Sequence, residues 1–157
     1  MTFEDWAKLL LQSNLLTAFV VGGFGLLTLW LGLRKFRSEK WWEKKAAAYA
    51  ATIEALHGML DLAMARIESQ EMGQEISDER LTVLSAANLA GLAEIRKGAN
   101  IGSFVMSESA ATILQKALDD FDRVEASTSD EFYDMRAAIL SKAISQLTSE
   151  AKKDLRT

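Results

Sequence analysis

Residues 15–33 read LLTAFVVGGFGLLTLWLGL, and this stretch decides how the rest of the chain is interpreted. Its 19 residues include no ionisable side chain, and its only hydroxyl groups are those of Thr17 and Thr28. A helix of this length rises roughly 28 Å, which is close to the hydrocarbon thickness of a bilayer, about 30 Å. The stretch therefore predicts a transmembrane helix over residues 14–34.

Two other interpretations of the apolar stretch are a cleaved signal peptide and a buried core helix. A signal peptide has a shorter apolar run that ends at a small-residue cleavage site, whereas this run leads into Arg34, Lys35 and Arg37. A helix that is apolar on every side is rare in the core of so small a domain. The membrane span is the interpretation that fits both the length and the flanks.

Cations gather on only one side of the predicted span. Residues 34–45 include six basic and two acidic residues, whereas residues 1–13 include one basic and two acidic ones. Because basic residues resist translocation, we expect the N-terminus outside and residues 46–157 in the cytoplasm. The side chains expected at the inner membrane interface are Arg34, Lys35, Arg37, Lys40, Trp41 and Trp42.

These patterns divide the chain into four parts. Residues 1–13 have a helical spacing of apolar side chains and are predicted to form an amphipathic segment at the outer interface. The membrane span follows at 14–34, and a basic and aromatic collar at 35–45. Residues 46–157 are predicted to form a cytoplasmic helical domain with 11 basic and 18 acidic residues.

Small residues recur along one face of the predicted span. Ala18, Gly22, Gly25 and Gly32 follow one another at spacings of four, three and seven, which places them on one stripe of a helix. In lipid, small residues let neighbouring backbones approach closely, so we expect the span to self-associate. The alternative is that glycine is simply common in membrane helices.

The helical domain is predicted to be all-α, with four helices. The first helix carries apolar or small residues at alternating steps of four and three, the spacing of a coiled coil. This seam fits either a second chain or the protein's own later helices, and Gly73 is predicted to end the helix. The residues of the seam are Trp42, Ala46, Tyr49, Ile53, Leu56, Leu60, Ala63 and Ile67.

Polar residues mark where the other three helices begin. Ser77, Ser107 and either Thr128 or Ser129 precede apolar runs, and their hydroxyl groups suit the N-cap position. The second helix is expected to end near Lys97, with Gly98 as its stop. No segment alternates with period two for long enough to predict a strand.

The composition narrows the chemistry available to the chain. Without cysteine there is no disulfide, thiolate ligand or cysteine nucleophile, and with His57 as the only histidine there is no histidine pair for zinc. Asp119, Asp120 and Asp122 lie together without a histidine partner and are interpreted as a solvated face. We expect no metal, no cofactor and no catalytic residue.

Residues 96–103, RKGANIGS, are the one segment that predicts a ligand. Glycines let backbone N–H groups approach a phosphate, and a following helix start favours an anion. On this hypothesis Arg96, Lys97 and Asn100 contact a nucleotide-like ligand or an RNA backbone. The alternative is an ordinary turn after a helix end, with Ile101, Phe104 and Val105 filling the core.

The order of parts resembles that of small bacterial membrane proteins that act as effectors in CRISPR and other anti-phage systems. The resemblance rests on the glycine-bearing anchor, on RKFR at 34–37 and KWWEKK at 40–45, and on AY at 48–49 and IEALH at 53–57. Some members have a nuclease-like helical domain with an Arg-x4-His element, which this chain lacks, so ribonuclease activity is not implied. The resemblance implies an oligomer in the bacterial inner membrane whose cytoplasmic domains sense an infection signal.

The expected function is therefore that of a non-enzymatic membrane effector. It would form a homo-oligomer and make a pore or otherwise perturb the bilayer during anti-phage, CRISPR-associated defence. Its expected partners are the lipid bilayer, further copies of itself, and a nucleotide second messenger, RNA or a CRISPR effector complex. The alternative is a membrane-tethered adaptor that recruits a cytoplasmic partner and conducts nothing.

Overall fold

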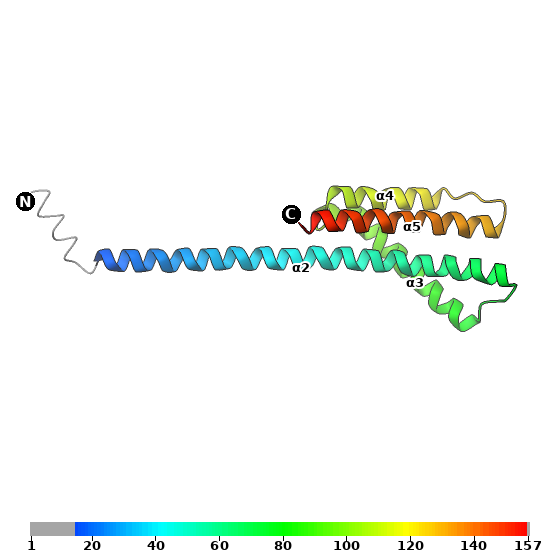
Figure 1. Cartoon of the computed structure of the whole chain (residues 1–157), viewed down its shortest axis with the longest axis horizontal. Helices are drawn as coiled ribbons and strands as arrows, with labels where there is room; N and C mark the ends of the chain where they lie inside the picture. Colours follow the sequence, from blue (N-terminus) through cyan, green and yellow to red (C-terminus); the bar gives the residue numbers. More distant parts are fainter. Residues whose placement is uncertain (1–14, 157) are drawn as a thin grey trace, which may run out of the picture. The chain divides into compact units, whose positions relative to one another are not determined.

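The structure is a computed structural model that describes residues 15–156. In the described residues it is all-helical, with four α-helices, one short 3-10 helix and no strand. Along the chain these are α2 (Leu15–Met72), α3 (Asp78–Ile101), η1 (Gly102–Phe104), α4 (Glu108–Asp122) and α5 (Ser129–Asp154) (Figure 1). The prediction of an all-α fold is confirmed for this part of the chain.

The chain divides into two units, Met1–Trp41 and Trp42–Thr157. The first unit holds the beginning of α2. The second unit, here called the helical domain, holds the remainder of α2 together with α3, η1, α4 and α5. The predicted amphipathic segment, residues 1–13, lies outside the described residues.

The predicted membrane span has a described backbone but side chains that are not described. Residues 15–33 are helical as the first part of α2, in agreement with the predicted helix. Among the residues that the structure describes in full, no helix is both long and apolar enough to cross a membrane. The side chains of residues 15–31 and 33–38 lie outside the described set, so the span and most of its small-residue stripe stay predictions.

The helix starts predicted from the sequence are confirmed. The Ser77 hydroxyl accepts a hydrogen bond from the Arg80 N–H at 3.4 Å, and the Ser107 hydroxyl accepts one from Ala110 at 3.1 Å. Of the two candidates for the last cap, Thr128 is the residue used: its hydroxyl accepts from the Glu131 N–H at 3.3 Å.

Gly73 follows the end of α2, as predicted. Its φ of 62° lies in the left-handed region, which a residue with a side chain rarely adopts. The Gly73 N–H donates to the Gln70 carbonyl at 3.3 Å, so one carbonyl of the last turn of α2 is satisfied.

The predicted end of the second helix at Gly98 is wrong. Helix α3 continues to Ile101, and η1 follows directly. Gly98 is buried, and a Cβ at this position would lie 2.8 Å from Leu114 Cδ1 on α4. The glycine therefore permits close packing of α3 on α4, and the predicted loop over residues 96–103 is helix for most of its length.

The apolar seam of α2 packs within its own chain. Tyr49, Leu56 and Ala63 are buried, and Ile53 and Leu60 are half-buried. Their neighbours in the core come from all the other helices: Ile95 of α3, Leu114, Leu118 and Phe121 of α4, and Leu140, Ala143 and Leu147 of α5. Of the two interpretations of the seam, packing on the later helices is therefore the one that the domain adopts.

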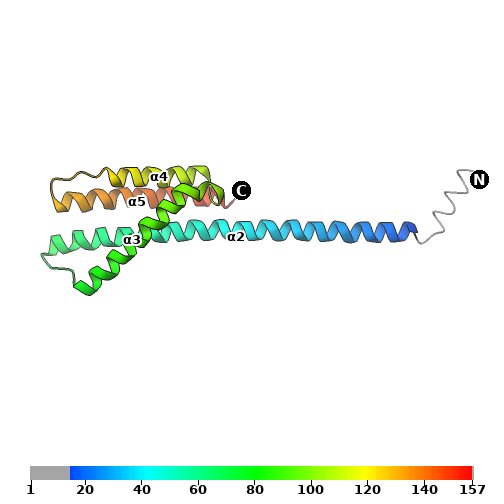
Figure 2. The same cartoon turned by 180° about the vertical axis from the view of Figure 1, so that it is seen from behind.

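Helices α2 and α5 run antiparallel along the domain. Trp42 Nε1 donates to the Leu155 carbonyl at 3.1 Å at one end, and Gln70 Nε2 donates to Ser129 Oγ at 3.1 Å at the other. Helix α3 instead crosses α2 at an angle, as both views show (Figures 1 and 2). At that crossing a Cβ on Gly91 would lie 2.7 Å from the Ala55 carbonyl oxygen, so only glycine fits.

Two glycines at this crossing provide a matched pair of substitutions. Gly91→Ala should lower the free energy of unfolding by about 1–2 kcal/mol, because overpacking strain exceeds the gain in helix propensity. Gly58→Ala places its methyl group 3.6 Å from Ala87 Cβ, an ordinary contact, and should leave stability unchanged or higher. Urea unfolding of the full-length chain, followed by circular dichroism, measures both. Equal stability of the two variants would contradict the close approach at Gly91.

Candidate functional site

A polar network lies where α2, α4 and α5 meet, with Tyr49 at its centre. The Tyr49 side chain is 1% exposed. Its hydroxyl donates to Asp154 Oδ2 at 2.8 Å and accepts from the Ser107 backbone N–H at 3.3 Å. One buried hydroxyl group thus links three helices that are far apart in the sequence.

Ser107 has two roles at this junction. Its hydroxyl oxygen caps α4 by accepting from the Ala110 N–H, and its proton is donated to Glu150 Oε1 of α5 at 2.9 Å. Tyr49 Oη lies 3.2 Å from the same hydroxyl oxygen. The N-cap that the sequence predicted for helix formation therefore also joins α4 to α5.

The end of α5 is held against α2 by two more bonds. Lys45 Nζ lies 2.6 Å from Asp154 Oδ1, and the side chains of the pair are 21% and 14% exposed. The Trp42 indole N–H donates to the Leu155 carbonyl at 3.1 Å. We call these residues the clasp: Trp42, Lys45, Tyr49, Ser107, Glu150, Asp154 and Leu155.

Burial and hydrogen bonding shift two pKa values in the clasp. Burial alone would raise the pKa of Asp154, but hydrogen bonds from Lys45 and Tyr49, together with the Lys45 charge, hold it below its ordinary value. Burial raises the pKa of Tyr49, and the adjacent Asp154 carboxylate adds to this effect. At neutral pH the clasp therefore contains an ionised Asp154 and a protonated Tyr49.

The clasp is suited to holding helices together. The Tyr49 hydroxyl is buried and its proton is donated to Asp154, while the Ser107 proton is donated to Glu150. Both hydroxyl groups are thus engaged in hydrogen bonds that join helices. Among the residues that the structure describes, no three His, Asp or Glu side chains are grouped so that they could hold a metal ion.

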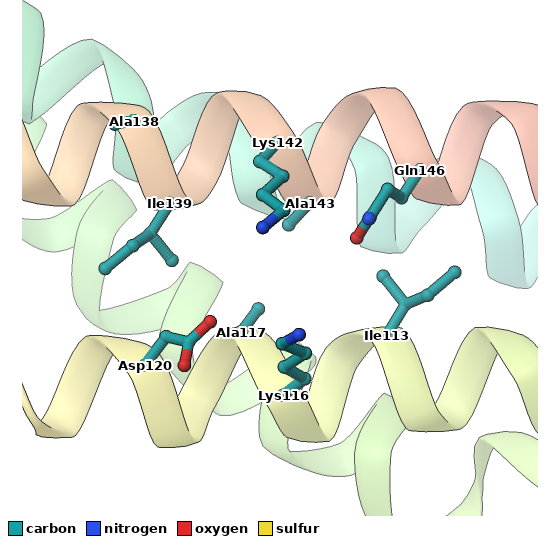
Figure 3. Close-up of a pocket in the computed structure, with 9 residues that line it drawn as sticks. All are labelled: Ile113, Lys116, Ala117, Asp120, Ala138, Ile139, Lys142, Ala143 and Gln146. Atoms are coloured by element: carbon teal, nitrogen blue, oxygen red, sulfur yellow. The ribbon is translucent and has the colours of Figure 1, made fainter.

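A small hollow lies between α4 and α5 (Figure 3). Lys116 of α4 and Lys142 of α5 face it from opposite helices, with Asp120 beside Lys116, and Ile113 and Ile139 flank the lysines. Its volume is about 170 Å³, below the 300–1,000 Å³ of pockets for drug-sized ligands. The hollow is therefore smaller than the pockets that enclose drug-sized ligands.

The three residues predicted to bind a ligand lie on the exposed surface of α3. Arg96, Lys97 and Asn100 are all exposed, and Lys97 Nζ lies 3.1 Å from each carboxylate oxygen of Glu94. Because the segment is helical, its backbone N–H groups serve the helix and form no phosphate cradle. Ligand binding by these three side chains stays a prediction, but the loop on which the prediction was based is a helix.

The predicted interface residues fall into two groups. The side chains of Arg34, Lys35 and Arg37 lie outside the described residues. Lys40 is exposed, and Trp41 and Trp42 are each 52% exposed. Trp42 is also part of the clasp, which the sequence did not predict, because its partner Leu155 lies 113 positions away.

Of the small-residue stripe, only Gly32 has surroundings that the structure describes. It is exposed, and a Cβ at this position would have no atom within 4 Å. Ala18, Gly22 and Gly25 lie among the residues whose surroundings are not described.

Comparison with protein-family models, curated proteins and solved structures gives no match. Any functional proposal for this chain therefore rests on its own residues, their geometry and the resemblance in the order of its parts.

Removing the Tyr49 hydroxyl tests the centre of the clasp. Tyr49→Phe should lower the free energy of unfolding by about 1–3 kcal/mol, because the buried Ser107 N–H and Asp154 carboxylate each lose a partner. Tyr133→Phe removes the only other tyrosine hydroxyl, from a half-buried ring, and serves as the matched control with little expected change. Urea unfolding of both full-length variants measures the difference. Equal destabilisation would contradict a special role for Tyr49.

The lowered pKa of Asp154 predicts a dependence on acid. Its folded pKa lies below the unfolded value of about 3.9, so its stabilising effect is present at neutral pH. That effect is lost as the pH falls from about 4 through the folded pKa. Asp154→Asn should therefore be less stable than wild type at neutral pH, and the difference should shrink in acid. Urea midpoints across this range measure it, and a constant difference would exclude a contribution from the charge.

Proposed function

We propose that this chain is a non-enzymatic membrane effector of bacterial anti-phage defence that assembles into a homo-oligomer and perturbs the inner membrane. The observation that carries the proposal is the composition of α2. This one helix contains both the 19 residues without an ionisable side chain and the buried seam of the helical domain. A chain built this way joins a membrane anchor to a folded domain without a separate linker.

The flanks of the apolar stretch support a single pass with the domain on the cytoplasmic side. Six cations follow the stretch within residues 34–45. Trp41 and Trp42, each about half exposed, have the amphipathic rings that favour the headgroup layer. The collar is thus suited to hold one end of the span at the inner interface.

Self-association is the step that would convert an anchor into an effector. A stripe of small residues lets spans pack closely, and Gly32, its described member, has open space around it. The span has no charged residue to line a permanent ion pathway. We therefore assign membrane perturbation to the assembled state, with assembly controlled by the helical domain.

The signal would reach the helical domain as a nucleotide second messenger, RNA or a CRISPR effector complex. Arg96, Lys97 and Asn100, exposed on α3, are the residues that we assign to this contact. Arginine and lysine recognise phosphate by charge-assisted hydrogen bonds, which suits all three kinds of signal.

A membrane-tethered adaptor is the second candidate, and exposed apolar side chains on α3 favour it. Val83 is 64% exposed and Leu89 is 67% exposed. Large exposed apolar residues are common in surfaces that bind another protein. An adaptor would use exposed apolar side chains of α3 to recruit a partner, and its span would serve only as an anchor.

Glycine substitutions on and off the stripe test the effector. Gly22→Leu with Gly25→Leu should abolish depolarisation of phage-infected cells expressing the full-length chain, because bulky side chains separate the spans. Gly23→Leu places one such bulky side chain off the stripe and should keep activity. A membrane-potential dye reports the effect, and the mass of the detergent-solubilised complex reports assembly. Wild-type cells that never depolarise during infection would contradict the proposal.

Exchange of the whole span separates the two candidates. Replacing residues 15–33 by an unrelated apolar span of equal length should abolish protection against phage if the spans themselves perturb the membrane. An adaptor should keep its protection, because any anchor holds the domain at the bilayer. Plaque counts on cells expressing each version measure the difference, and full protection by the exchanged version would favour the adaptor.

A further inference from the structure

The clasp brings together cations that are far apart in the sequence. Asp154 forms an ion pair with Lys45, and the Leu155 carbonyl accepts a hydrogen bond from Trp42. The end of α5 therefore lies beside the first turns of α2 in the helical domain. The exposed cations at this end come from both segments: Lys44 of α2, and Lys152, Lys153 and Arg156 at the end of the chain.

The carboxylates near these cations are largely turned inward. Asp154 accepts from Lys45 and Tyr49, and Glu150 accepts from Ser107. Glu150 also lies 3.5 Å from Lys153 Nζ, but the Lys153 side chain remains 76% exposed. Among the described residues at this end of the domain, Glu43 and Glu108 are the exposed acids, against the four exposed cations, so the charge that these residues present outward is positive.

Exposed aromatic side chains accompany the cations. Phe104 of η1 is 76% exposed, the highest value among the large apolar side chains that the structure describes. It precedes Ser107 of the clasp by three residues, so η1 lies at this same end of the domain. Trp42 is 52% exposed although its indole N–H is bonded. Cations beside exposed aromatic rings are the composition of surfaces that bind anionic bilayers.

We infer that this end of the helical domain, formed by Trp42, Lys44, Phe104, Lys152, Lys153 and Arg156, docks on anionic phospholipid headgroups. The inference rests on the proposed function, because the span brings the domain to the bilayer. Trp42 lies nine positions after Leu33, and a helical step of that length rises roughly 14 Å. The headgroup layer and one Debye length together cover about the same distance. The short connection therefore allows the end of the domain to come within electrostatic reach of the lipid.

A fluorescent label tests this docking in full-length protein reconstituted into vesicles. The chain has no cysteine, so Ser103→Cys gives a unique labelling site beside Phe104. Ser127→Cys, in the exposed connection between α4 and α5 at the other end of the domain, gives the matched control. Collisional quenching by lipids that carry a spin label in the headgroup region reports contact with the bilayer surface.

The expected result is strong quenching at position 103 in vesicles of phosphatidylcholine with phosphatidylglycerol, and weak quenching in phosphatidylcholine alone. High salt should remove the difference, because it screens the attraction. The label at position 127 should stay unquenched in both lipids. Lys152→Gln, Lys153→Gln and Arg156→Gln together should reduce quenching at position 103 to the phosphatidylcholine level. Lys116→Gln, Arg123→Gln and Lys142→Gln, an equal loss of charge elsewhere on the domain, should not.

Flotation of the vesicles separates failure of this inference from failure of the proposed function. Protein that floats with both vesicle types, but shows no quenching at position 103 that depends on phosphatidylglycerol, overturns the docking alone. Protein that floats with neither overturns the membrane span and the docking with it. Circular dichroism of each charge variant confirms that the helices remain folded, so loss of quenching reports contact with lipid.

Discussion

The helical domain depends on one buried phenol hydroxyl group. A buried polar group without a hydrogen-bond partner lowers the stability of the fold by about as much as several favourable contacts raise it. Tyr49, at 1% exposure, is therefore tolerated only because its hydroxyl is hydrogen-bonded. Its donor and acceptor requirements are met by the carboxylate of Asp154 and the N–H of Ser107. Those two partners fix the end of α5 and the start of α4 against the same turn of α2, and the Gln70–Ser129 hydrogen bond at the other end completes the antiparallel pair of α2 and α5.

The two ends of the domain satisfy their charges in different ways. At the clasp, a cation and a carboxylate neutralise each other at low exposure. Near the opposite end, the Arg136 guanidinium lies between the rings of Phe121 and Phe132, at 4.0 and 4.1 Å from their centroids. Burial lowers the pKa of Arg136, and its buried Nε has no hydrogen-bond partner among the described residues. Arg136 thus stacks on two rings and leaves its Nε without a hydrogen bond, whereas Lys45 and Asp154 of the clasp form a direct ion pair.

The starts of the helices were predictable from interactions within one turn. The packing between the helices depends on contacts between residues distant in the sequence. The caps at Ser77, Ser107 and Thr128 depend on residues within one turn, so the sequence alone located them. Gly98 was misinterpreted because glycine has two uses in helices, termination and close packing, and Leu114, which selects the second use, lies on another helix. The clasp could not be predicted for the same reason. Lys45 was assigned to the collar by its charge, and nothing near it in the sequence indicates a partner 109 positions away.

The clasp also divides the collar into residues that serve the domain and residues that remain exposed for the proposed contact with lipid. Lys45 is 21% exposed and bound to Asp154, whereas its neighbour Lys44 is exposed. A side chain cannot neutralise a carboxylate and a lipid phosphate at once without weakening one of the two contacts. Recruitment of Lys45 by the bilayer would leave Asp154 with less compensation and would loosen the end of α5, whereas recruitment of Lys44 carries no such cost. The positive charge on this part of α2 is therefore of two kinds, and only the exposed kind is compatible with both the proposed docking on headgroups and a closed clasp.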